Sequence, residues 1–451
     1  MTMSDPQQPE TSGQHPAPAT PLSRHMLAGG TILAVRQWFG AALGVGGVAV
    51  ITGLIGAAAF GLYAAAAAIV GLLWMMIPTA IVGALVRRQH EPKTEAWRGA
   101  VLLLLLCGVA APAVAFLAGT VLERWSRLDG VALATAALMA PAVFAWPVQA
   151  AVARLERGLD YLAIARADLL GQTAFVTIGC LLAWAGWGTW ALIVAGICHH
   201  LLAAALALRA AGGLPARAGC ASEARRLAGE AAALASVSAT WQARPLIVPL
   251  VVGWAWGAAA VGQVALAMRV VETLSAARGA ANRVATAALP RLVDDAPAMR
   301  AAIARTAAIA SWATAAPLAL TALAVAALRA WIPPEWSACG SVFPGLAAFS
   351  IVAGLHAPCV SALVVIGRWR GVCLMHLGIV ATIAAVALLA VPPLGPLGYA
   401  VAELSALPWF AYAWWTCRRA FGPPFSVLGL AGVLFGAALG AAPWWWPGGL
   451  G

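Results

Sequence analysis

The sequence predicts an all-α fold: a polytopic transmembrane bundle of about 12–14 helices in two pseudo-symmetric six-helix lobes around a central cavity. Three observations predict it, namely the composition, the succession of apolar segments and an internal repeat. Of the 451 residues, 63% are hydrophobic and 10% are charged, whereas soluble domains carry about 25% charged residues. No soluble fold of this length buries so much apolar surface, so the surrounding solvent must be lipid.

Apolar segments follow one another along nearly the whole chain, and about 20 residues suffice for each to cross a bilayer. About thirteen candidate spans lie at 27–51, 61–85, 99–121, 131–152, 167–186, 188–208, 232–253, 258–282, 303–328, 341–366, 371–391, 396–416 and 426–446. They predict an N-lobe over 26–210, a cytoplasmic linker over 211–230, a C-lobe over 231–420 and an additional C-terminal helix over 421–451. Residues 1–25 are rich in Pro, Gln, Ser and Thr without an apolar run, which predicts a disordered cytoplasmic tail.

The loops between these spans alternate in charge. One alternate set carries most of the 27 basic residues, and the other carries only Arg124, Arg127 and Arg329. Basic loops stay on the cytoplasmic side of a membrane protein, so the N-terminus is expected in the cytoplasm. The distribution also explains the net charge of +11 as a set of topology signals. A nucleic-acid partner is therefore not expected.

A short sequence occurs twice, each time where a first span of a lobe turns into the second. The pattern Gly-Ala-Ala-Ala-x-Gly starts at Gly56 and again at Gly257. Equal position and equal orientation of the two copies predict two lobes related by an axis along the membrane normal. Many transporters are built from such repeats and hold their substrate between the lobes near the midplane.

One arginine lies deep in the first span of each predicted lobe. Arg36 and Arg244 are roughly 13 Å and 18 Å into their spans, and Gln37 and Gln242 accompany them. Charges at this depth normally face protein or water, because lipid disfavours them. These four residues are candidates for contact with a substrate.

A further pair lies in the span over 258–282. Arg269 and Glu272 are three residues apart, so on a helix they are neighbours that can pair with each other. Few other acids are available inside the membrane, namely Glu403 and, at a span edge, Asp168. At least one of the arginines is therefore expected to lack an acidic partner, although salt bridges between helices are the alternative for each. An unpartnered guanidinium suits a phosphate group, so Arg269 and Glu272 join the candidate substrate-binding residues.

No pattern in the sequence nominates catalysis or a bound cofactor. The eight cysteines show no metal-ligand spacing, and there is no nucleotide-binding glycine loop or metal-binding His/Glu helix. We expect no cofactor, no metal site and no enzymatic activity. A membrane enzyme such as a polysaccharide polymerase would be expected to have acidic residues or a sizeable loop outside.

Several segments together resemble the polysaccharide (O-antigen-type) flippases of the MATE-like exporter superfamily. The first is a Leu-Gly-Pro-x-x-Phe-Gly-x-Tyr signature, which Leu54, Gly56, Phe60, Gly61 and Tyr63 fit, with Ile55 inserted and the proline absent. Weaker similarities, in the family's order, occur at 168–172, 186–190, 267–272, 288–292, 331–336 and 363–368.

This resemblance implies a function as well as a fold. The substrate would be an undecaprenyl-diphosphate-linked oligosaccharide repeat unit for surface polysaccharide, moved by alternating access from the inner to the outer leaflet of the bacterial cytoplasmic membrane. A cationic cavity between the lobes would hold it. The family often has fourteen helices where we count about thirteen. A coupling ion (proton or sodium) and the polysaccharide polymerase machinery are the further partners that it suggests.

Two other transporters remain as alternatives. An ion-coupled multidrug exporter of the same superfamily binds organic cations, which favour a cavity with surplus acid, whereas base exceeds acid here. A lipid II flippase is a close relative of the leading hypothesis, and the sequence does not separate the two.

Overall fold

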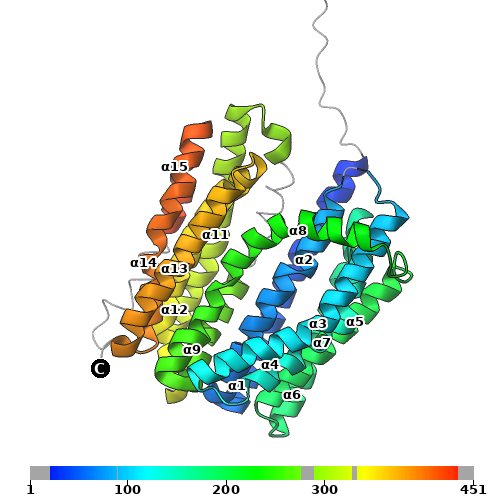
Figure 1. Ribbon diagram of the computed structural model, residues 1–451. Helices are drawn as coiled ribbons and strands as arrows, with labels where there is room; N and C mark the ends of the chain where they lie inside the picture. Colours follow the sequence, from blue (N-terminus) through cyan, green and yellow to red (C-terminus); the bar gives the residue numbers. More distant parts are fainter. Residues whose placement is uncertain (1–20, 89, 276–288, 328–332, 435–451) are drawn as a thin grey trace, which may run out of the picture.

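The computed structural model describes residues 21–88, 90–275, 289–327 and 333–434, and throughout these the regular structure is helical (Figure 1). The first half of the chain forms seven helices within the described residues. They are α1 (Pro21–Met76), α2 (Pro78–Val86), α3 (Thr94–Ser126), α4 (Val131–Met139), α5 (Ala142–Arg157), α6 (Tyr161–Trp184) and α7 (Thr189–Ala210). Figure 1 shows these helices gathered in one group.

The second half starts with α8 (Ala221–Gln242), which crosses from the first group of helices to the second (Figure 1). It packs on α2 and α3 as well as on α13. The elements that follow it are η1 (Arg244–Leu246), η2 (Val248–Val252), α9 (Gly253–Leu274), η3 (Leu289–Leu292), α11 (Ala296–Ala327), η5 (Pro334–Trp336), α12 (Ser337–Val365), α13 (Trp369–Leu394), α14 (Leu397–Ser405), η6 (Leu407–Trp409) and α15 (Phe410–Phe421).

Eight helical segments of the described chain are long and apolar enough to cross a membrane, or nine if the bent pair α4 and α5 is one span. The chain is thus a multi-pass membrane protein. Two of the eight, Leu43–Val86 and Leu234–Leu274, have 44 and 41 residues, and each overlaps two of the spans expected from the sequence. The expected span 396–416 is divided among α14, η6 and α15. Most of the expected span 426–446 lies outside the described residues.

Each of these two long segments bends at the glycine that begins the repeated sequence. Gly56 has φ 80° and ψ 168°, and Gly257 has φ 74° and ψ −172°. Both conformations are accessible mainly to glycine. The same unusual backbone at matching positions of the repeat supports the interpretation that the two copies are structurally equivalent.

Just beyond the bends, α1 and α9 cross in direct backbone contact. A Cβ atom on Gly61 would overlap the carbonyl oxygen of Ala258, and one on Gly262 would overlap the carbonyl oxygen of Ala57. The two contacts are reciprocal, because Gly61 matches Gly262 and Ala57 matches Ala258 in the repeat. A local two-fold axis therefore passes through this crossing.

The outer surface of the bundle is apolar where lipid would cover it. Leu117 and Val121 on α3, Leu320 on α11 and Leu389 on α13 are all more than three-fifths exposed. At the end of the bundle where α1 bends, the exposed Trp184 is the last residue of α6. Tryptophan is typical of the membrane–water interface.

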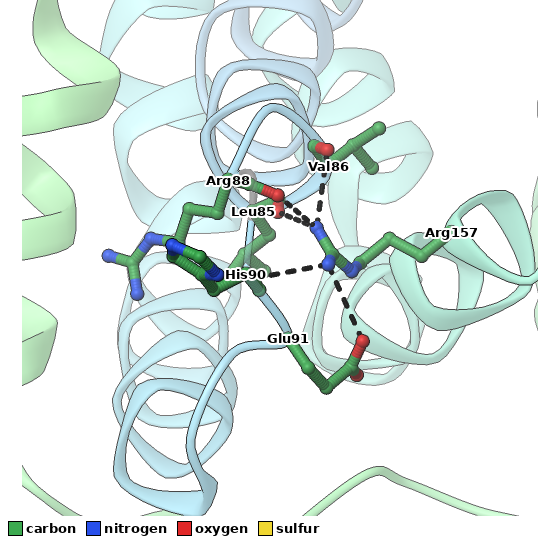
Figure 2. A network of polar contacts seen from close by, with 6 residues as sticks. All are labelled: Leu85, Val86, Arg88, His90, Glu91 and Arg157. Atoms are coloured by element: carbon green, nitrogen blue, oxygen red, sulfur yellow. Dashed lines mark hydrogen bonds and ion pairs between the residues drawn. The ribbon is translucent and has the colours of Figure 1, made fainter.

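At the opposite end of the bundle, a network of polar contacts fixes the short helix α2 (Figure 2). Arg157, at the end of α5, donates to the carbonyl oxygens of Leu85, Val86 and Arg88 at 3.0, 3.3 and 2.8 Å. These are carbonyl groups at a helix C-terminus, which lack partners within the helix. Arg88 in turn pairs with Glu230 of α8 at 3.0 Å. The first group of helices and α8 are thereby tied together at this end.

Candidate functional site

A cavity of about 330 Å³ lies between the two groups of helices. Its walls come from α1, α6 and α7 on one side and from α8, η1, η2 and α9 on the other. Most of the lining is apolar or aromatic, and the residues are Val48, Phe60, Tyr63, Ala64, Ala67, Ala68, Gly71, Leu72, Phe175, Leu192, Gln242, Pro245, Val248, Pro249, Val261, Ala265, Met268, Arg269 and Glu272.

The crossing of α1 and α9 bounds this cavity at the bent ends of the helices. Phe60 and Val261, which precede the crossing glycines directly, both line it. Because the backbones touch at Gly61 and Gly262, there is no room between the two helices for a side chain at either position. Arg269 and Glu272 follow Gly262 on α9 by seven and ten residues and so lie toward the other end of the bundle.

One wall of the cavity is an irregular stretch of helix. After α8 the backbone passes through the 3₁₀ turn η1 and the π-helical turn η2 before α9 resumes an α-helical path. Pro245 and Pro249, which line the cavity, have no backbone N–H to donate and so interrupt the regular hydrogen bonding. Irregular backbone at membrane depth is tolerated where it lines a cavity.

Three of the residues predicted from the sequence meet in the cavity wall, namely Gln242, Arg269 and Glu272. Arg269 is exposed to the cavity, and no carboxylate of the described residues comes within 4.0 Å of its guanidinium. Glu272 is also exposed. The pairing that their spacing allows is not formed. Of the two arginines Arg244 and Arg269, Arg269 is the one without an acidic partner among the described residues.

Arg244 lies behind the cavity wall, and its side chain is only 11% exposed. Its Nη1 is 3.2 Å from Oε1 and 3.3 Å from Oε2 of Glu403, and its Nη2 is 3.6 Å from Oε1 of Glu272. The guanidinium also lies 5.3 Å from the ring centre of Trp241 and 5.2 Å from that of Phe349. For Arg244 the structure thus shows the salt bridges between helices that were the alternative to an anion contact.

Arg36 and Gln37 belong to α1, but their side chains lie outside the part of the structure that is described. Their predicted contact with a substrate therefore stays a prediction.

Sequence reasoning missed most of the cavity lining. Tyr63 and Met268 were not nominated, because an apolar or aromatic residue that faces a cavity has the same sequence pattern as one that faces a neighbouring helix. The signal that was available is the repeat, since the residues around the two bends line the cavity from both sides.

Residues 50–333 match the sequence profile of a family described as "Polysaccharide biosynthesis protein". No curated protein matches the sequence. Among solved structures, the fold is similar to "Lipid II flippase MurJ" in an inward closed conformation, with a TM-score of 0.70 and 11% identity over 90% of this chain and 96% of that chain. It is also similar to the MATE multidrug transporter DinF-BH, with a TM-score of 0.61 and 14% identity over 92% and 99% of the two chains.

At these identities the likeness concerns the fold alone. It confirms the all-α transmembrane bundle that the sequence predicts, because structures of this architecture align with nearly the whole chain.

Proposed function

The chain belongs to the family of polysaccharide biosynthesis proteins, and from this premise we propose that it flips undecaprenyl-diphosphate-linked oligosaccharide repeat units from the cytoplasmic to the periplasmic leaflet. The observation that carries the proposal is Arg269, a cation in the cavity between the two groups of helices without a carboxylate within 4.0 Å among the described residues. The family and the fold support a flippase or transporter. The diphosphate supplies the anion that Arg269 lacks.

The chemistry of the cavity suits such a substrate. A guanidinium donates hydrogen bonds to phosphate in a planar fork, and the amide of Gln242 in the same wall can bond to sugar hydroxyls. The lipid tail stays in the bilayer beside the apolar surface of the helices. A full repeat unit exceeds about 330 Å³, so the groups must separate further during transport, and Arg36 and Gln37 are further proposed contacts.

Alternating access about the crossing of α1 and α9 would move the headgroup across the membrane. By the distribution of basic residues, the bent ends of the helices face the periplasm and the N-terminus lies in the cytoplasm of the bacterial cell. The state seen here is then closed toward the periplasm at Gly61 and Gly262. A coupling ion (proton or sodium) and an association with the polysaccharide polymerase machinery complete the proposal.

A second candidate is an ion-coupled multidrug exporter. The observation in its favour is the half-exposed carboxylate of Glu272 in the cavity wall, which an organic cation would contact. The cavity also presents Arg269, however, and a guanidinium repels an organic cation. The flippase is therefore the preferred function.

Complementation of a strain that lacks its polysaccharide flippase tests the proposal. Arg269→Gln removes the positive charge with little change in size, so we expect wild type to restore surface polysaccharide and this variant to fail at matched membrane expression. Arg225→Gln, at an exposed position of α8, is the matched control and should complement fully. Full complementation by Arg269→Gln would refute the role of the cation. Failure of wild type with the matching sugar pathway present would refute the substrate class.

A further inference from the structure

Two oppositely charged residues on α9 form no ion pair with each other in this structure. Arg269 and Glu272 are three residues apart, which places their side chains side by side on a helix and normally favours an ion pair. Glu272 reaches instead for Arg244 in η1, with Oε1 3.6 Å from Nη2. The anion site and the acid that would neutralise it thus share one wall of the cavity.

We propose that Arg244 is a positioning residue of the anion site: by holding Glu272, it keeps this carboxylate off Arg269 and leaves Arg269 charged and open to the diphosphate. This inference rests on the proposed function, since it concerns the same cavity. The proposal gives different roles to Arg244 and Arg269, which the sequence analysis both nominated as substrate-binding residues. Arg269 touches the substrate, and Arg244 acts through Glu272.

The surroundings of Arg244 explain how it can hold a second acid. Its guanidinium is fixed from behind by Glu403, which is 1% exposed, and by the rings of Trp241 and Phe349. Its planar fork directs Nη1 to Glu403 and Nη2 toward Glu272. A lysine would offer neither the second nitrogen nor the fixed plane. These contacts orient the guanidinium independently of Glu272.

Glu272 is the more exposed and more distant of the two acidic partners of Arg244. Its side chain is 49% exposed and its contact with Arg244 is the longer one. The carboxylate of Glu272 can pair with either Arg244 or Arg269. When it pairs with Arg244, Arg269 remains a free cation in the cavity. A phosphate on Arg269 repels Glu272 toward Arg244, so substrate binding and the Arg244–Glu272 contact reinforce each other.

Second-site rescue separates this role from a purely structural one. The double variant Arg244→Met/Glu403→Gln removes the buried pair together and leaves no uncompensated buried charge, but it releases Glu272. The triple variant adds Glu272→Gln and removes the competing acid. The probe is geranylgeranyl diphosphate bound to the purified full-length protein in lipid nanodiscs, with geranylgeraniol as the control that lacks the anion.

We expect the double variant to bind the diphosphate at least about tenfold more weakly than wild type, since a charge-assisted hydrogen bond is lost. The triple variant should recover most of that affinity. A triple variant as weak as the double, or a double variant that binds like wild type, would overturn the proposal. If wild type itself does not prefer the diphosphate to the alcohol, the proposed function fails first, and this inference with it.

Glu272→Gln alone provides a test that leaves the buried pair intact and does not depend on the stability of the double variant. Removal of a negative charge beside the anion should tighten binding of geranylgeranyl diphosphate. Weaker binding would mean that Glu272 itself contacts the substrate, which contradicts the role assigned to Arg244.

Discussion

At the scale of single residues, Arg244 and Glu403 form a buried ion pair inside the second group of helices. Glu403 is 1% exposed and Arg244 is 11% exposed in their side chains. A buried pair contributes little net stability, but a partner left alone is costly because its charge stays out of water. Both residues therefore depend on each other more than on any other contact.

Glu403→Gln should destabilise the protein by about 3–5 kcal/mol, because Arg244 loses its buried counterion. Glu272→Gln at the same guanidinium should cost at most about 1 kcal/mol, since that carboxylate is half exposed to the cavity and exposed pairs are weak. Thermal unfolding of the two variants in the same detergent compares them. Equal loss of thermal stability in both variants would mean that Glu403 is not the principal partner of Arg244.

The sequence predicts part of this arrangement. Few intramembrane acids face several intramembrane arginines, so an arginine without an acidic partner is expected, and Arg269 fits that expectation among the described residues. Which arginine stays free depends on the position of α14, which packs on α12 and α13 and places Glu403 beside Arg244. Sequence spacing left the neighbouring pair on α9 and salt bridges between helices as open alternatives, because spacing contains no information about contacts between distant helices.

At the scale of elements, the reciprocal contact of α1 and α9 sets the geometry of the cavity. Glycine is required at Gly61 and Gly262 by close approach of the backbones and at Gly56 and Gly257 by positive φ angles. The repeat in the sequence predicted the equivalence of these positions. The break of 131–157 into α4 and α5, at an angle of 41°, was not predicted, because Pro141 and Pro147 are compatible with a continuous or a bent membrane helix.

Gly61→Ala and Gly262→Ala should impair the protein to a similar degree, because each added methyl group meets a backbone carbonyl of the other helix. Overpacking of this kind costs about 1–3 kcal/mol, and it should also prevent the closed state and reduce complementation. Gly53→Ala on α1 is the matched control, since nothing lies within 4 Å of its added Cβ. Thermal stability and complementation measured together check this, and strongly unequal effects of the two substitutions would contradict the local two-fold symmetry.

At the scale of the whole molecule, two groups of helices converge on one crossing, and α8 runs between them at the other end (Figure 1). The ion pair of Arg88 with Glu230 joins α8 to the loop after α2 at 3.0 Å. The cavity lies between the groups, beside the crossing, with Arg269 in its wall. This arrangement suits the proposed rocking motion about the crossing, which would carry a bound headgroup from one side of the membrane to the other.

Translocation in reconstituted proteoliposomes tests this account most directly. Undecaprenyl-diphosphate-linked oligosaccharide is placed in both leaflets, and the fraction open to an external sugar-modifying enzyme is followed over time. We predict that wild type makes the inner-leaflet pool accessible, that Arg269→Gln does not, and that Arg225→Gln behaves like wild type. No acceleration by wild type with the matching oligosaccharide, or equal rates with Arg269→Gln, would contradict the account.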